Sequence, residues 1–239
     1  MYETSTFQEK SMKILSRSTA RDVQSVDYTD TTASDSHKVL RNTYMLLSMT
    51  LLFSALTAGL SVAFAIPGPG IIITLVAYFG LLFVVTKLRN SGWGIAAVFA
   101  LTGFLGYTLG PILSVYLKMP GGSSIVMTAM GLTGLIFMGL SAYVLVSKRD
   151  FSFMGGFLMA GMIVALVASL GAIFFQIPAL SLAISGVMVL LMSGMILFET
   201  SNIIRGGETN YIMATVSLYI TIFNLFTSLL QLLGFMEKE

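Results

Sequence analysis

Charged residues divide the sequence into long apolar windows. No charge occurs in the 45 residues between Arg41 and Lys87, or in the 48 residues between Asp150 and Glu199. Three further windows, at 90–117, 119–147 and 209–236, contain 28, 29 and 28 uncharged residues. A membrane-spanning helix needs about 20 apolar residues. Each short window therefore holds one span, and each long window holds two.

Both long windows contain the helix breaker that two spans require. The first carries Pro-Gly-Pro-Gly at residues 67–70, and the second carries Pro178; proline cannot donate a helical hydrogen bond. Unpaired backbone groups are too costly in lipid for open structures, and runs this long without alternation favour helices over a barrel. The sequence predicts an all-α integral membrane protein whose transmembrane domain, 41–239, is a seven-helix bundle. The predicted spans are 43–65, 70–87, 93–117, 124–146, 153–175, 179–199 and 211–235.

Basic residues are distributed unevenly between the two sides of these spans. One side carries seven, namely Lys38, Arg41, Lys87, Arg89, Lys148, Arg149 and Arg205, and the other carries Lys118 and Lys238. Basic residues close to span ends mark the cytoplasmic side. The N-terminus is therefore predicted to be cytoplasmic, and an odd number of spans places the C-terminus outside. In a bacterium this is the inner membrane, with a periplasmic C-terminus.

The N-terminal segment, 1–40, differs in composition from the remainder. Thirteen of its first 36 residues are Ser or Thr, with acidic and basic residues mixed among them. It lacks the apolar core of a signal peptide, so we expect it to be retained. Its small apolar content predicts a disordered cytoplasmic tail.

The composition excludes most catalytic chemistry. The chain has no cysteine and one histidine, and 10% of its residues are charged with a net charge of +2, against about 25% charged in soluble domains. Thiolate metal sites, cysteine nucleophiles, multi-histidine zinc sites and a nucleic-acid surface are not expected. An aspartyl protease needs two membrane aspartates, but Asp150 is the only Asp after residue 35. We predict no enzyme, no cofactor and no metal centre, with the lipid bilayer as a partner.

Small residues recur inside several spans. The third predicted span contains Gly103, Gly106 and Gly110 followed by Pro111, and the fourth contains glycines at 131, 134 and 139. Such residues let helix backbones approach closely in lipid. Gly110-Pro111 is therefore either a hinge or a tightly packed kink, and packing is the favoured interpretation.

Glu199 is the one acidic residue placed ambiguously with respect to the membrane. It ends the sixth predicted span, where a carboxylate is either a proton sensor or cation ligand, or a helix-end acid that reaches water or pairs with Arg205. The seventh span offers neutral partners, because Ser217, Thr221, Asn224 and Ser228 recur at helical spacing. This stripe either lines a cavity or holds the helix in the bundle, and the second role is favoured.

Three stretches resemble the bacterial branch of the Bax inhibitor family. They are Ser-His-Lys-Val-Leu-Arg-Asn-Thr-Tyr at 36–44, Thr-Gly-Phe-Leu-Gly-Tyr at 102–107 continuing to Gly-Pro-Ile-Leu at 110–113, and the run from Leu197 to Tyr219. The resemblance covers about 36–235. It implies a bundle with the last helix central and six helices around it, in an inner-membrane protein that binds and restrains the FtsH protease.

The resemblance also implies an alternative function. Family members elsewhere are pH-sensitive calcium leaks with an aspartate pair on the last two spans as sensor. Here these positions fall on Glu199 and Thr221, with Asn224 nearby, so the pair is broken. Two adjacent carboxylates can share a proton and titrate together, whereas a carboxylate and a threonine cannot. The calcium or proton leak therefore ranks second, and a small-solute transporter, for which internal repeats are missing, ranks third.

The leading hypothesis is a modulator of FtsH-type proteolysis. A disordered tail of about 40 residues can extend roughly 130 Å, which is enough to enter a nearby AAA pore. The spans behind it would resist extraction because they are tightly packed. Such a protein would occupy the protease and protect other membrane substrates.

Overall fold

The computed structural model describes residues 36–237 and places seven helices of membrane-spanning length in them. The first helix is Ser36–Ala63. It is followed by α2 (Ile71–Leu88), α3 (Trp93–Leu117), α4 (Gly122–Ser147), the 3₁₀ turn η1 (Ser152–Met154), α5 (Gly155–Phe175), α6 (Pro178–Ile204) and α7 (Tyr211–Met236). The described residues contain no strand. The all-helical fold and the seven spans are confirmed.

Two boundaries differ from the prediction. The first helix begins at Ser36, so the last five residues of the predicted 1–40 tail are helical, and 1–35 lies outside the described residues. Helix α6 continues to Ile204 instead of ending at Glu199. The polar residues after Glu199 resembled a helix end, but Thr200 and Ser201 are fully buried. Ser201 Oγ accepts a hydrogen bond from Phe151 N at 3.1 Å, so this polar turn is used for packing.

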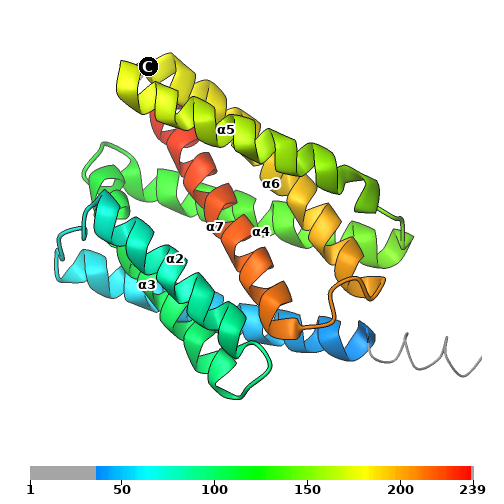
Figure 1. The fold of residues 1–239 in the computed structure, drawn as a ribbon. Coiled ribbons are helices and arrows are strands. Elements are labelled where there is room, and N and C mark those ends of the chain that lie inside the picture. The colour runs from blue at the N-terminus through cyan, green and yellow to red at the C-terminus, as the bar shows by residue number, and fades with distance from the viewer. Residues whose placement is uncertain (1–35, 238–239) are drawn as a thin grey trace, which may run out of the picture.

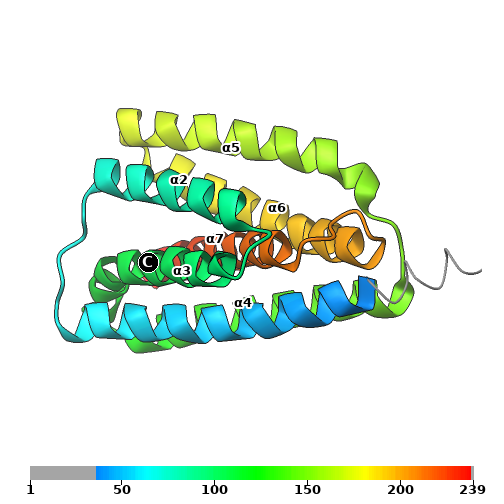
Figure 2. The same cartoon turned by 60° about the horizontal axis from the view of Figure 1, so that its bottom comes forward.

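The chain reverses where the sequence carries breakers and caps. Residues 64–70 connect the first helix to α2, and α6 starts at Pro178, where a missing N–H costs nothing. Helix α7 is capped by Asn210, whose Oδ1 accepts hydrogen bonds from Ile212 N and Met213 N at 3.0 and 3.1 Å. The helix ends and connections that carry the seven basic residues gather at one end of the bundle, which we call the basic end, and the connection from α3 to α4, which contains Lys118, lies at the other (Figures 1 and 2).

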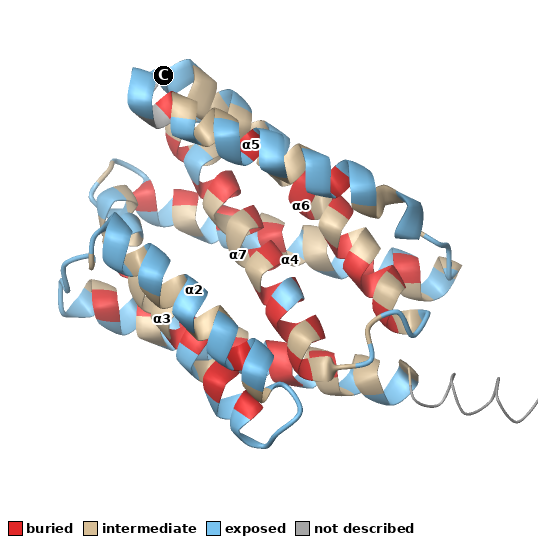
Figure 3. Cartoon of the chain, in the orientation of Figure 1, coloured by how far each residue is buried: buried red, intermediate tan, exposed pale blue. Residues whose placement is uncertain are grey.

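Helix α7 belongs to both apolar cores of the bundle. Its first half, from Ile212 to Ile222, belongs to a cluster with residues of the first helix, α2 and α3, and its second half, from Leu225 to Leu230, belongs to a cluster with residues of α4, α5 and α6. Buried residues follow its length, whereas α5 is largely exposed (Figure 3). Helix α7 contacts α2, α3, α4 and α6, and α5 packs on α6 and η1. A last helix with all six others around it stays a prediction.

Candidate functional site

Glu199 is buried between α6 and α7. Its side chain is 8% exposed, and Thr221 Oγ1 donates to its two carboxylate oxygens at 3.1 and 3.2 Å. The structure thus brings together the two residues that occupy the sensor positions implied by the resemblance. Arg205 does not form an ion pair with Glu199. Its Nε pairs with Asp150 Oδ1 at 3.6 Å, and its Nη2 donates to Lys148 O at 3.1 Å.

A cavity of about 110 Å³ adjoins Glu199 toward the basic end. Its lining includes a second carboxylate, Glu208, together with Asn202 and Ser217. Glu208 is half-buried and accepts a hydrogen bond from Asn210 N at 2.7 Å. Sequence reasoning missed Glu208 at this site. The available signal was Gly206-Gly207, since Gly206 takes a positive φ of 74° and returns the chain toward α6.

Asn224, the third predicted sensor residue, turns to its own helix. Its Nδ2 donates to Ile220 O at 2.8 Å, and among the described residues Asn224 forms no hydrogen bond with Glu199. The polar stripe of α7 is also uneven, because Ser217 is exposed while Thr221 and Ser228 are buried. These contacts support the packing interpretation of the stripe more than a continuous polar lining.

Gly103, Gly106 and Gly110 face the first helix. A Cβ at Gly103 would lie 2.6 Å from Phe53 Cε1, one at Gly106 would overlap Thr57 Oγ1 and Ser54 O, and one at Gly110 would overlap the Ser61 side chain. Helix α3 passes Pro111 without ending and continues to Leu117. These contacts support close packing, and a hinge at Gly110-Pro111 stays a prediction.

The glycines of α4 behave differently from those of α3. A Cβ at Gly131, Gly134 or Gly139 would meet nothing within 4 Å. Their expected role in close helix packing is therefore wrong. Spacing along a helix identifies a shared face but does not say whether that face meets a helix or lipid.

Two hydrogen bonds link the first helix, α3 and α7 through the hydroxyl groups of Ser54 and Tyr219. Ser54 Oγ lies 2.6 Å from Tyr219 Oη, and Tyr219 Oη donates to Thr102 O at 3.2 Å. Because the tyrosine proton is used on Thr102, Ser54 is the donor to Tyr219. We call the contacts of Ser54, Tyr219, Gly103, Gly106 and Gly110 the inner seam.

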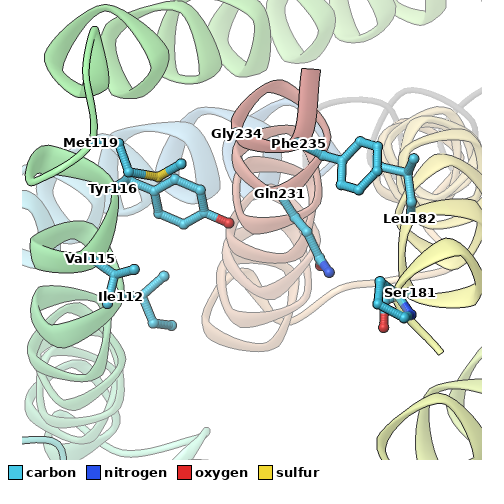
Figure 4. A pocket seen from close by; sticks show the side chains of 10 residues that line it. Ile112, Val115, Tyr116, Met119, Ser181, Leu182, Gln231, Gly234 and Phe235 are labelled. Atoms are coloured by element: carbon cyan, nitrogen blue, oxygen red, sulfur yellow. The ribbon is translucent and has the colours of Figure 1, made fainter. Parts of the chain in front are cut away.

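A second cavity, of about 460 Å³, opens at the end opposite the basic residues between α3, α6 and α7. Figure 4 shows Tyr116 on one wall, Ser181 and Leu182 on the other, and Gln231 on the α7 ridge between them. Gln231 Oε1 accepts a hydrogen bond from Ser185 Oγ at 2.8 Å. This cavity lies at the far end of α7 from Glu199.

Residues 36–238 match the model of the family described as "Inhibitor of apoptosis-promoting Bax1". The chain belongs to the Bax inhibitor family. This match begins where the described helices begin and leaves 1–35 outside it.

Several curated relatives cover nearly the whole chain. "Modulator of FtsH protease YccA" of Escherichia coli K12 is 56% identical over 209 residues, 87% of this chain and 95% of that protein. The protein named "Inner membrane protein YccA" in E. coli O6:H1 gives the same identity and coverage. An "Uncharacterized membrane protein" of Vibrio cholerae is 51% identical over 206 residues, 86% of this chain and 92% of its own length. With its seven spans, this Bax inhibitor family member is a multi-pass inner-membrane protein.

Proposed function

We propose that the chain is a non-enzymatic modulator that binds an FtsH-type membrane protease and restrains it. The observation that carries this proposal is the 56% identity, over 87% of the chain, to the protein named as modulator of FtsH protease. A regulatory role also agrees with the amino-acid composition, because the chain has no cysteine and its one histidine is His37.

The basic end is assigned to the cytoplasm in this proposal. Its helix ends and connections carry seven basic residues, whereas Lys118 is the basic residue described at the other end, and basic residues close to span ends are retained on the cytoplasmic side. The N-terminal segment enters the first helix at this end. It is therefore on the side where an AAA-type motor would engage it, and the C-terminus is periplasmic.

The bundle behind the segment is suited to slow extraction. Pulling on the first helix separates it from α3, where the glycine contacts are, and from Tyr219 on α7. Buried polar groups that lose their partners in lipid are costly. A protease that has engaged the segment would be held by a substrate that yields slowly, and other substrates would be spared.

Deletion of residues 2–30 tests this mechanism. The shortened protein is expected to turn over more slowly, to co-purify less with the protease, and to lose its protection of a second membrane substrate. Pulse-chase of both proteins and co-purification from solubilised membranes provide the measurement. A matched control carries residues 2–30 in scrambled order, which preserves length and charge. Unchanged turnover and unchanged protease activity in the deletion variant would reject the mechanism.

A cation leak is the second candidate, favoured because the carboxylates of Glu199 and Glu208 line the same cavity. It ranks lower because the Thr221 hydroxyl, which donates to both carboxylate oxygens of Glu199, is neutral. Calcium flux into liposomes decides between the candidates. Acid-sensitive flux that is lost in Glu199→Gln and kept in Glu237→Gln, at the opposite end, would place the leak first.

A further inference from the structure

Two adjoining cavities lie at the basic end, where the start of the first helix meets the end of α4. The larger, about 630 Å³, is lined by His37, Lys38, Leu40, Arg41, Tyr44 and Leu145. The smaller, about 320 Å³, shares His37, Leu40 and Leu145 and adds Lys148 and Arg205. The described lining residues include four basic side chains and no acidic one. We call this pair of cavities the basic groove.

The walls of the basic groove are charged outside and apolar inside. Arg41 on the first helix and Lys148 at the end of α4 are exposed, whereas Leu40 and Leu145 are half-buried. Arg205 is paired with Asp150, so it contributes less unbalanced charge. An excess of positive charge therefore lies above an apolar floor at the basic end of the bundle.

The line along which the first helix and α4 meet, which we call the outer seam, widens into an apolar groove farther from the basic end. Tyr44 stacks on Phe137, with ring centroids 5.8 Å apart, just inside the basic groove. Beyond this pair the first helix and α4 form the walls of a groove of about 610 Å³, with α3 and α7 contributing to its lining. Leu51, at its near end, is ten residues from Arg41, or about 15 Å along a helix.

This groove has unfilled space on both walls. Gly59 on the first helix and Gly134 on α4 line it, and a Cβ at either would meet nothing within 4 Å. Its lining is almost entirely apolar, from Ala55 and Ala58 on one wall to Met130 and Phe137 on the other. An apolar chain that runs along the outer seam would fill this space.

We propose that the outer seam, between the first helix and α4, binds an anionic phospholipid of the cytoplasmic leaflet. Its phosphate lies in the basic groove against Arg41 and Lys148, and one acyl chain passes Tyr44 and Phe137 into the apolar groove. Basic pockets between transmembrane helices at the cytoplasmic side recognise anionic headgroups. A free phosphate would use the basic groove but leave the apolar groove unfilled, and a transmembrane helix would use the apolar groove alone. This site is independent of the proposed protease partner.

Lipid titration of the full-length, delipidated protein tests the headgroup part. Native mass spectrometry of bound lipid is expected to show tighter binding of phosphatidylglycerol than of phosphatidylcholine. The double substitution Arg41→Gln with Lys148→Gln removes two charges, each contributing roughly fivefold near an anionic surface, so affinity falls about 25-fold. Lys118→Gln, at the opposite end, leaves affinity unchanged. Arg41→Lys with Lys148→Arg preserves the charges and retains binding, and thermal unfolding reports that each variant is folded.

Chain length tests the apolar part. Gly59→Leu fills the apolar groove, whereas Gly131→Leu adds the same side chain at an equally open α4 position outside it. Gly59→Leu is expected to abolish the preference for long-chain over short-chain phosphatidylglycerol, and Gly131→Leu is expected to keep it.

Four outcomes would overturn the proposal. They are equal binding of phosphatidylcholine, an equal loss in Lys118→Gln, binding of free glycerol phosphate as tight as that of the lipid, and lipid binding that appears only after residues 2–30 are removed. The last outcome would assign the basic groove to the acidic residues of the chain's own N-terminal segment.

Discussion

The inner seam and α5 show two ways in which one chain builds membrane helices. At the inner seam, glycines and hydroxyl groups bring the first helix, α3 and α7 into close contact, and Tyr219 is 1% exposed. Helix α5 has few buried residues, and large side chains such as Phe157 and Leu166 face outward. Lipid is as apolar as leucine, so apolar side chains do not tell inside from outside. Glycines and hydroxyl groups mark the inside where they meet another helix, as they do at the inner seam.

Glycine substitution gives the largest expected contrast between the two regions. Gly106→Val would drive its side chain into the Ser54 carbonyl, a backbone atom that cannot move aside, and should destabilise the fold by about 3 kcal/mol. Gly156→Val in α5 meets open space and should change stability by about 0.5 kcal/mol or less. Unfolding in mixed detergent and dodecyl sulfate micelles, followed by circular dichroism, measures both. Equal losses would remove the distinction.

Serine substitution gives an intermediate contrast. Ser54→Ala removes the donor to Tyr219 across the inner seam, and interhelical hydrogen bonds in membranes contribute roughly 1 kcal/mol. Ser169→Ala in α5 removes a bond to Ala165 O of its own helix and should stay within about 0.5 kcal/mol of zero. The same unfolding assay applies. A larger loss in Ser169→Ala would contradict the assignment of α5 as peripheral.

The smallest effect is expected at Asp150, in the connection that leads into α5. Hydrogen bonds from Ser152, with a smaller contribution from Arg205, lower the pKa of Asp150 below its ordinary value. A lowered pKa in the folded protein adds stability above the unfolded-state value, near pH 4, and this stability is lost as the pH falls through the folded-state value. The melting temperature of Asp150→Asn should thus lie slightly below wild type at pH 7 and converge with it near pH 3. Both side chains of the Asp150–Arg205 pair are about half exposed, so salt should reduce the difference. A melting-temperature difference that grows toward acid pH would contradict the lowered pKa of Asp150.

The sequence predicted where helices cross but not which faces they present. Charge-free windows and the breakers at 67–70 and Pro178 identify the spans because the bilayer fixes their length. The end of α6 was misplaced, since the polar residues after Glu199 look like a membrane boundary until Ser201 is seen bonded to Phe151. The α4 glycines have the spacing of a packing face, yet they face open space. Both errors concern which neighbour a residue meets, and local pattern does not contain that information.

The candidate site was predicted in part for the same reason. Glu199 and Thr221 occupy positions carried over from a family pattern, and the structure places them within hydrogen-bonding distance. Asn224 shares the helical stripe of Thr221 but bonds to its own backbone. Glu208 reaches the same cavity through a turn at two glycines, and its arrival there depends on the path of that turn.

The position of the inner seam has a mechanical consequence. A motor that pulls on the N-terminus loads the first helix before any other, and that helix is fastened by the interlocked glycine contacts to α3 and by Ser54 to Tyr219. The loosely held α5 is fourth in line behind it and bears no load at that stage. Resistance to extraction is thus concentrated at the first step. A stalled motor would stop while it holds the N-terminal segment, with the whole bundle still in the bilayer.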